Sequence, residues 1–183
     1  MMTTDKPIIL KRDCPAVMVP SGEQLSLQSG SQVWLTQALG GGYTVMTDHG
    51  YTVRIDGRDG DALGLIDAAS SVTPTTRDAG SVQERVWQQL RTCFDPEIPV
   101  NIVDLGLIYD CRIEPLPGGG YKALVQFTLT AQGCGMAEVF KADIQRKLFE
   151  VSDVREAAVD LVWDPPWSQS RMSVEAKHQL GIE

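Results

Sequence analysis

The second half of the chain alternates between helical and strand-like spacing of its apolar residues. A helix beginning after the potential N-cap Ser81 is predicted by apolar residues at helical spacing: Val82, Val86, Leu90 and Cys93. Alternation predicts three strands with the inward-facing sets Leu107, Tyr109, Cys111 and Ile113; Tyr121, Ala123, Val125, Phe127 and Leu129; and Ala157, Val159, Leu161 and Trp163. A second helix is predicted from about 134 to 151. The order α-β-β-α-β predicts two layers, with both helices on one face of the sheet.

The first half has the alternation typical of β-strands. The stretches "GYTVMTD" (42–48) and "GYTVRID" (50–56) are near copies, and Asp48-His49-Gly50 suits a three-residue hairpin turn with glycine in the left-handed conformation. An earlier strand is predicted in "SQVWLTQAL". The glycine cluster before Tyr43 leads into a strand, which favours a turn over a phosphate-binding loop. The acidic segment "DGRDGDALGLID" is interpreted as a solvated turn.

Small, polar and turn-prone residues at 68–80 indicate a linker between two domains. We therefore expect a small β-rich N-terminal domain at 1–67 and a second domain at 81–183. A crossover helix would make the third strand of the second domain parallel to its second strand, which gives a mixed sheet. The predicted fold class is α+β.

Composition and charge exclude several classes of protein. The net charge is −8 with no block of lysine and arginine, whereas nucleic-acid-binding proteins normally carry a basic stripe. No run approaches the roughly 18 apolar residues that a membrane span needs. The first residues contain too short an apolar run for the core of a signal peptide, so a cytoplasmic location is expected.

The four cysteines are predicted to have different roles. Cys93 and Cys111 lie on predicted apolar faces and are expected in the core, whereas the position of Cys14 predicts nothing. Cys134 stands between Gly133 and Gly135, where a strand gives way to a helix. A helix start lowers the pKa of a thiol, which favours a reactive or metal-binding Cys134 over a small residue selected for close packing. No CxxC occurs, which argues against a self-contained zinc or cluster site.

Carboxylates are concentrated in the loop "DPEIPVNIVDLG", where Pro96 and Pro99 hold the backbone extended. Some of these carboxylates could simply close turns. In the predicted topology, however, the start of the first strand and the ends of the second and third strands meet at one edge. That edge collects the predicted functional thiol, Cys134, and the predicted lining residues Asp95, Glu97, Asp104, Thr130, Asp164 and Trp167.

These residues and motifs resemble the SufT family of iron–sulfur assembly factors. The similarity runs from about 81 to 181 through "DPEIPVNIVDLGLIY", "TLTAQGCGM", "DLVWDPPW" and "RMSVEAKHQLG". The domain is also similar to PaaD, to the eukaryotic cytosolic iron–sulfur targeting factors and, in its element order, to the C-terminal domain of NifU. The first half resembles the N-terminal extension of the long SufT branch. NifU-type domains place a CxxC at this helix start, whereas "QGCGM" holds one cysteine, and many short relatives follow it with proline where this chain has Gly135.

The resemblance implies a non-enzymatic auxiliary factor in iron–sulfur cluster assembly or delivery, with Cys134 as the functional thiol beside Asp104. The implied partners are scaffold proteins, client apoproteins and a second copy of the chain, and the implied cargo is iron or a labile iron–sulfur cluster. Because one cysteine falls short of four ligands, a bound cluster is expected to bridge two chains. Two alternatives remain open: an adaptor whose thiol never meets iron, and a cysteine-dependent enzyme, which would need a general base near Cys134.

Overall fold

The computed structural model describes residues 6–65, 80–131 and 135–182. The chain divides into two compact units, Met1–Thr73 and Pro74–Glu183, called here the N-terminal and C-terminal units. The predicted linker at 68–80 lies outside the described residues except for Gly80. Among the described residues, no helix combines the length and hydropathy that crossing a membrane requires.

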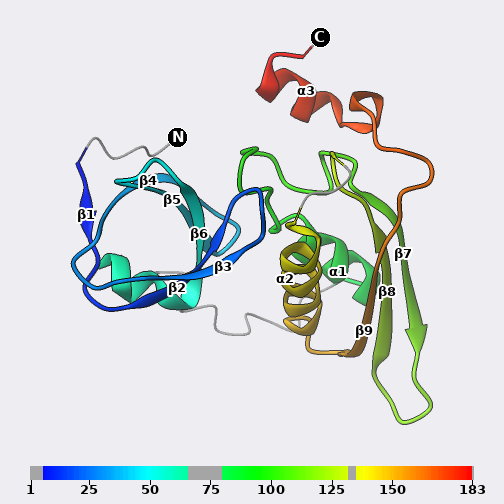
Figure 1. Cartoon of the computed structure of the whole chain (residues 1–183). Helices are drawn as coiled ribbons and strands as arrows, with labels where there is room; N and C mark the ends of the chain where they lie inside the picture. Colours follow the sequence, from blue (N-terminus) through cyan, green and yellow to red (C-terminus); the bar gives the residue numbers. More distant parts are fainter. Residues whose placement is uncertain (1–5, 66–79, 132–134, 183) are drawn as a thin grey trace. The chain divides into compact units, whose positions relative to one another are not determined.

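The N-terminal unit is a single six-stranded sheet that curls around its own core (Figure 1). All pairings are antiparallel and the strand order is β1-β4-β5-β6-β2-β3. The strands are β1 (Ile8–Ile9), β2 (Cys14–Met18), β3 (Gln24–Leu27), β4 (Gln32–Leu39), β5 (Gly42–Thr47) and β6 (Thr52–Asp56). The strands predicted from alternation are therefore confirmed.

The hairpin between β5 and β6 has the predicted three-residue turn. The N–H of Thr47 donates to the carbonyl of Tyr51 at 2.8 Å, and Gly50 has a φ of 80°. That left-handed conformation costs glycine little because it has no Cβ. The glycine cluster likewise forms a turn, between β4 and β5, as predicted.

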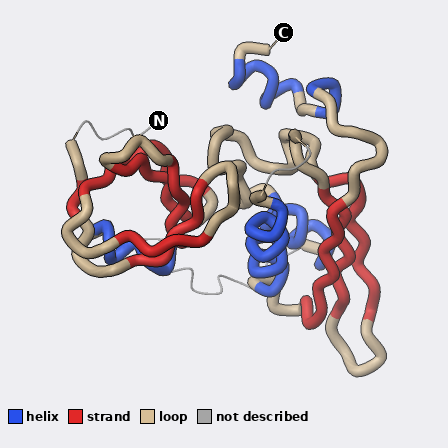
Figure 2. The backbone as a smooth tube through the Cα atoms, viewed as in Figure 1, coloured by secondary structure: helices blue, strands red, loops and turns tan. Residues whose placement is uncertain are grey.

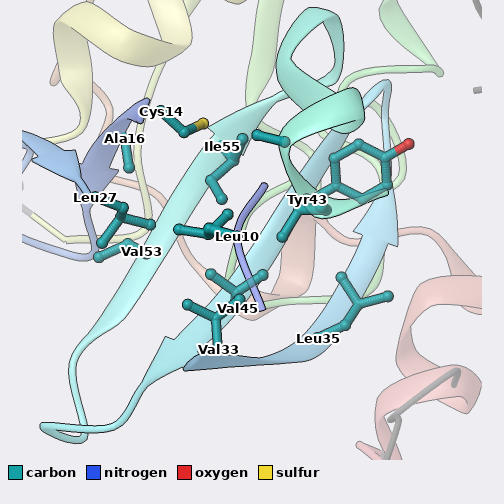
Figure 3. Close-up of a cluster of buried hydrophobic side chains, with 12 residues drawn as sticks. Leu10, Cys14, Ala16, Leu27, Val33, Leu35, Tyr43, Val45, Val53 and Ile55 are labelled. Atoms are coloured by element: carbon teal, nitrogen blue, oxygen red, sulfur yellow. The ribbon is translucent and has the colours of Figure 1, made fainter. Parts of the chain in front are cut away.

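Alternating side chains of the curled sheet form a closed hydrophobic core. Leu10 is 1% exposed and lies at its centre among Val33, Val45 and Val53 (Figure 3). Cys14, whose sequence position predicted nothing, is a fully buried member of this core. Burial and the negative charge of Asp59 raise the pKa of the Cys14 thiol to about 11.

The predicted solvated turn in the acidic segment is wrong. Residues Gly57–Leu63 form the short 3-10 helix η1, in which Ala62 and Leu63 are buried. Arg12 donates to Asp59 and Asp61 at 2.6–2.8 Å, and this pairing lowers the pKa of Asp61. The charge pattern suggested solvation, but the apolar residues that follow the carboxylates join the core.

The C-terminal unit has the predicted α-β-β-α-β order, followed by a further turn and helix. Its sheet has the order β7-β8-β9, with β8 antiparallel to β7 and parallel to β9. Figure 2 shows both main helices on the same face of this sheet. The elements are α1 (Val82–Leu90), β7 (Ile108–Pro115), β8 (Tyr121–Phe127), α2 (Ala137–Phe149), β9 (Val154–Leu161), η2 (Gln169–Arg171) and α3 (Val174–Leu180). The α+β class is confirmed, whereas η2 and α3 were not predicted.

The helix-facing side of the sheet follows the predicted pattern except at Tyr109, with deeper burial in the centre than at the edges. The buried predicted residues are Leu107, Cys111, Ala123, Val125, Phe127, Leu129 and Val159. The others are partly exposed: Tyr109, Ile113, Tyr121, Ala157, Leu161 and Trp163. All but one of these belong to the two edge strands or their flanks, where a neighbouring strand is present on one side only.

Helix α1 begins as predicted and ends earlier. Ser81 and Glu84 form a reciprocal capping box, in which each side chain accepts the backbone N–H of the other residue. The helix ends at Leu90, so Cys93 does not lie on its apolar face. Cys93 is nevertheless fully buried, which confirms the predicted core position and corrects the element that carries it.

Helix α2 is shorter than the predicted span of 134 to 151. It begins at Ala137 and ends at Phe149, and its N-cap Met136 makes no side-chain capping bond. The helix therefore starts three residues later than the predicted start at about 134, and Cys134 itself lies outside the described residues. Hydrophobic spacing alone could not locate the start, because the buried Met136 fits the helical pattern without being helical.

Candidate functional site

The candidate site is built on the connection between α1 and β7, called here the site loop (residues 94–107). Phe94 and Asn101 form an isolated antiparallel bridge across it, and the N–H of Ile102 donates to the carbonyl of Cys93 at 2.9 Å. Four of its apolar side chains are at most 2% exposed: Val100, Ile102, Leu105 and Leu107. Buried anchors and backbone pairing thus fix a segment that lacks regular secondary structure.

Asp104 lies in a polar turn of the site loop. The side-chain oxygen of Asn101 accepts the N–H groups of Val103 and Asp104 at 3.1 and 2.9 Å, and its amide donates to the Asp104 carboxylate at 2.6 Å. Arg91 donates to the other carboxylate oxygen at 3.4 Å. The Asp104 side chain is 27% exposed, so its charge remains accessible from this edge.

Asp95 and Glu97 occupy different surroundings. Asp95 is 9% exposed and its carboxylate accepts the N–H of Glu97 at 2.8 Å, which is the turn-closing role that the sequence left open. Glu97 itself is exposed. The structure therefore separates the three predicted loop carboxylates into a buried turn residue, an exposed residue and the partly exposed Asp104.

The segment after β9, called here the C-terminal segment (residues 162–182), packs along the site loop. Trp167 donates its indole N–H to the Leu105 carbonyl at 2.8 Å, and the N–H of Ser173 donates to the Asp104 carbonyl at 2.8 Å. Gln179 on α3 donates to the Pro99 carbonyl at 2.7 Å. The predicted meeting of the Asp104 loop with the residues after the third strand is observed, through Trp167, whereas Asp164 is exposed.

Gly106 permits this close packing. Its φ is +72°, and a Cβ built there would lie 2.3 Å from the Arg171 carbonyl oxygen. Nearby, the Arg171 guanidinium lies 4.0 Å from the centre of the Tyr109 ring, and the Tyr109 hydroxyl donates to the Pro165 carbonyl at 2.7 Å. Aromatic, cationic and main-chain contacts therefore hold the two segments together.

Tyr109 was predicted to face the core, and this prediction is wrong. The register shifts between Ile108 and Asp110, so Tyr109 is the extra residue of a β-bulge at the start of β7. The bulge turns the tyrosine towards Pro165 and Arg171 of the C-terminal segment. The alternation of apolar and polar residues cannot predict such an insertion. It does not mark the position at which one strand carries an extra residue relative to its partner strand.

The end of β8 contributes the third side of the site. The N–H of Thr128 donates to the Leu107 carbonyl at 2.8 Å, which fixes this end of the strand beside the end of the site loop. Thr128 is fully buried, and among the described residues its hydroxyl has no hydrogen-bond partner. Thr130, two residues on, is exposed. Cys134 lies outside the described residues, so its predicted proximity to Asp104 stays a prediction.

Several residues that organise this edge were missed at the sequence level. Asn101 carried a usable signal, since asparagine commonly caps turns through bonds to following N–H groups. Arg91, Arg171 and Gln179 carried none, because each acts on a residue distant in sequence or in an unpredicted element. The described residues contain no group of three or more histidine, cysteine or acidic side chains placed to hold a metal ion.

The thiols in the described residues differ from the predicted functional thiol. Cys14, Cys93 and Cys111 are at most 7% exposed. Burial, assisted by the charge of Asp110, raises the pKa of Cys111 to about 11. A buried thiol with a raised pKa holds its proton at neutral pH and is a poor nucleophile and metal ligand.

Comparison with known proteins places this unit in a family. Residues 83–161 match the family model described as "Iron-sulfur cluster assembly protein". A Porphyromonas gingivalis protein named "Fe-S protein maturation auxiliary factor" is 39% identical over 100 residues, covering 55% of this chain and 91% of that protein. Two more relatives are similar over 97% of their own lengths: YitW of Bacillus subtilis (33% identical, 56% of this chain) and SufT of Staphylococcus aureus (34%, 49% of this chain), both named as Fe-S protein maturation auxiliary factors. The chain belongs to the SufT family of iron–sulfur cluster assembly proteins.

Proposed function

We propose that this protein is an auxiliary factor in the maturation of iron–sulfur proteins and that Cys134 is its functional thiol. In this proposal Cys134 receives iron or a labile cluster from the assembly machinery and passes it to client apoproteins. The role is that of a carrier in the cytoplasm and requires no catalytic step. Its first support is the shared name of relatives whose sequences align with this chain over nearly their whole lengths.

The observation that carries the proposal is the burial of the other three cysteines. Cys14 belongs to the core of the curled sheet, and Cys93 and Cys111 belong to the C-terminal unit's interior. A soft thiolate ligand suits iron–sulfur chemistry better than carboxylates do. If a thiol of this chain handles iron, the burial of the other three cysteines therefore leaves Cys134 as the candidate.

The segments around the end of β8, which precedes Cys134 in the sequence, are bonded to one another, and this supports a binding site at that edge of the sheet. The site loop, the end of β8 and the C-terminal segment are tied together by the bonds of Leu105, Leu107 and Asp104 described above. The Thr128 hydroxyl is buried without a partner among the described residues, which costs about 1–3 kcal/mol unless a further group satisfies it. A polar group of the cargo or a water molecule would remove that penalty.

Ligand number indicates how a cluster would be held. A typical cluster takes four protein ligands, and one chain offers one suitable thiol. Asp104 is already bonded to Asn101 and Arg91, and Asp95 to the N–H of Glu97. We infer that a cluster would bridge Cys134 of this chain and ligands of a second copy, a scaffold or a client.

The test is anaerobic reconstitution of the full chain with iron and sulfide, comparing wild type, Cys134→Ser and the control Cys111→Ala. We expect wild type and Cys111→Ala to show iron–sulfur visible absorption and Cys134→Ser to lose it. Native mass spectrometry should find the iron in a two-chain species. Retention of the cluster by Cys134→Ser would contradict the ligand role, and a complete cluster on a stable monomer would contradict bridging. Absence of iron from wild type, combined with support of client maturation, would favour an adaptor that holds no metal.

A further inference from the structure

Among residues 6–65, the sheet of the N-terminal unit leaves one side of β3 without a neighbouring strand. The outer strands of its sheet are β1, of two residues, and β3, of four. β3 pairs with β2 on one side, with Leu25 opposite Ala16 and Leu27 opposite Cys14. An edge strand with free main-chain groups is a template for pairing with another chain.

The direction of these main-chain groups follows from the ladder. The N–H of Met18 donates to the Glu23 carbonyl at 2.8 Å, which makes these two residues a hydrogen-bonded pair. Because hydrogen-bonded pairs alternate in an antiparallel ladder, Leu25 and Leu27 bond to β2, and the N–H and C=O groups of Gln24 and Ser26 point away from it. Within residues 6–65 these outward groups have no hydrogen-bond partner.

Recesses lie on both sides of this edge. A cavity of about 310 Å³ is lined by apolar side chains that include Met18, Leu25 and Leu27 and by polar ones that include Ser31, Gln32 and Asp48. A more open groove of about 520 Å³ runs over the outer face, lined by Pro15, Val17, Gln24, Ser26, Arg54 and Asp56. Successive side chains of a strand point to opposite faces, so a strand added at β3 would send alternate side chains towards each recess.

We propose that the β3 edge binds an extended segment of a partner protein by β-strand addition. The segment pairs with the main chain of Gln24 and Ser26, places an apolar side chain in the 310 Å³ cavity and lays polar side chains over the outer groove. Main-chain bonds supply affinity in this mode of recognition, and the alternate pockets supply specificity. The outer groove carries Arg54, Asp56, Arg58 and Asp59, which suits polar side chains and disfavours apolar ones.

A peptide fits this edge better than a second copy of the chain. Specific protein–protein interfaces bury about 1,200–2,000 Å² in total, and pairing two four-residue strands provides a small part of that area. A peptide can instead extend beyond the four residues of β3 and reach both recesses. The site also lies outside residues 83–161 that match the family model, so its partner is additional to the function proposed for the C-terminal unit.

The experiment uses the full chain and a short fluorescent peptide of alternating valine and threonine, with binding followed by anisotropy. Two matched peptides carry N-methyl groups on all valines or on all threonines. In a paired strand, the N–H groups that face β3 belong to every second residue, and these are either all valines or all threonines. Methylation of the residues that face β3 should abolish binding, and methylation of the other residues should leave binding nearly unchanged. Each lost hydrogen bond should weaken binding about fivefold.

Two further measurements locate the peptide and identify competing partners. Amide exchange of Gln24 and Ser26 should slow on peptide binding, and Ser26→Pro, which removes an outward N–H, should weaken binding while circular dichroism confirms the fold. Replacing the central valine with aspartate should also weaken binding, because the carboxylate would be placed against the apolar Leu25 and Leu27 and near the acidic Asp48. The proposal would be overturned if the unmodified peptide did not bind or if both methylated peptides bound equally well. It would also be overturned if sedimentation showed that the slowed amide exchange comes from self-association of the protein.

Discussion

The two units of this protein achieve burial in different ways. The N-terminal unit closes its core with antiparallel strands, and three pairs of neighbours in its sheet are joined directly as hairpins: β2–β3, β4–β5 and β5–β6. The C-terminal unit has a three-stranded sheet, and irregular segments complete the edge that carries the candidate site. There, Trp167 reaches Leu105 and Gln179 reaches Pro99, across 62 and 80 positions of sequence.

The difference indicates where each unit is sensitive to change. In the N-terminal unit, stability rests on apolar side chains packed inside a sheet. The C-terminal unit also has a buried apolar core, and its candidate site depends in addition on a few long-range bonds to main-chain carbonyls. Substitutions that leave the core intact should therefore alter the site of the C-terminal unit, whereas the N-terminal unit should respond chiefly to core truncation.

The largest expected effect comes from core truncation in each unit. Leu10→Ala and Leu148→Ala each empty a site at most 1% exposed, and each should lower the free energy of unfolding of its own unit by about 2–5 kcal/mol. Urea unfolding followed by residue-resolved amide exchange should show each loss confined to one unit. A loss shared equally by both units would show that they unfold together and would remove the basis of the comparison.

The rate of thiol labelling should differ by about two orders of magnitude between the buried Cys14 and Cys111 and the proposed functional thiol, Cys134. A pKa of about 11 in place of an ordinary 9.0 lowers the thiolate fraction of Cys14 and Cys111 at neutral pH about a hundredfold. Iodoacetamide labelling of the native protein, read by mass spectrometry, should therefore modify Cys134 first. Faster labelling of Cys111 or Cys93 would contradict the assignment of Cys134, and denatured protein serves as the control for equal intrinsic reactivity.

Gly106→Ala should test the contact between the site loop and the C-terminal segment. The added Cβ meets the Arg171 carbonyl at 2.3 Å in a left-handed conformation, so we expect a loss of about 2 kcal/mol, with increased exchange of the Ser173 amide. Gly119→Ala is the matched control, because Gly119 is also left-handed at φ +89° but has open space around its Cβ position. Equal losses in the two variants would mean that backbone conformation, and not this contact, sets the cost.

Alkaline pH should weaken both units through their buried thiols. Folded Cys14 and Cys111 keep their protons up to a pKa of about 11, whereas unfolded thiols lose theirs near 9.0. The unfolded state therefore binds fewer protons between these values, and stability falls as pH rises through this window. We expect roughly 1–2 kcal/mol per thiol after allowance for solvent screening. Cys14→Ala and Cys111→Ala should each flatten the decline in their own unit; an unchanged slope would contradict the prediction.

Asp104→Asn should have the smallest effect on stability. The substitution removes the ion pair with Arg91, which is partly exposed and worth at most about 1 kcal/mol, and retains an oxygen that can accept the Asn101 amide. If Asp104 lies beside Cys134, loss of its negative charge should lower the pKa of that thiol. Ultraviolet titration of the thiolate in a variant retaining only Cys134 would measure this. An unchanged titration would show that the two side chains are not neighbours.

Much of the fold followed from local patterns in the sequence. The β5–β6 hairpin was predictable because alternation and a single glycine requirement operate within a few residues. The α-β-β-α-β order was predictable because helical and strand periodicities differ strongly. Helix ends were less predictable, since Met136 and Cys93 continue an apolar pattern beyond the hydrogen-bonded helix.

The sequence by itself determined the strands, the main helices and the edge at which Asp104 and Trp167 were expected to meet. Only tertiary structure decided that Asp95 is a buried turn residue and that a bulge turns Tyr109 away from the core. It also decided that Cys14 belongs to the core of the N-terminal unit. Tertiary structure also placed Arg171 against Gly106 and Tyr109. The physical reason is range: periodicity records the side on which a residue is buried along its own element, whereas bulges, carbonyl partners and close approaches depend on segments dozens of residues away.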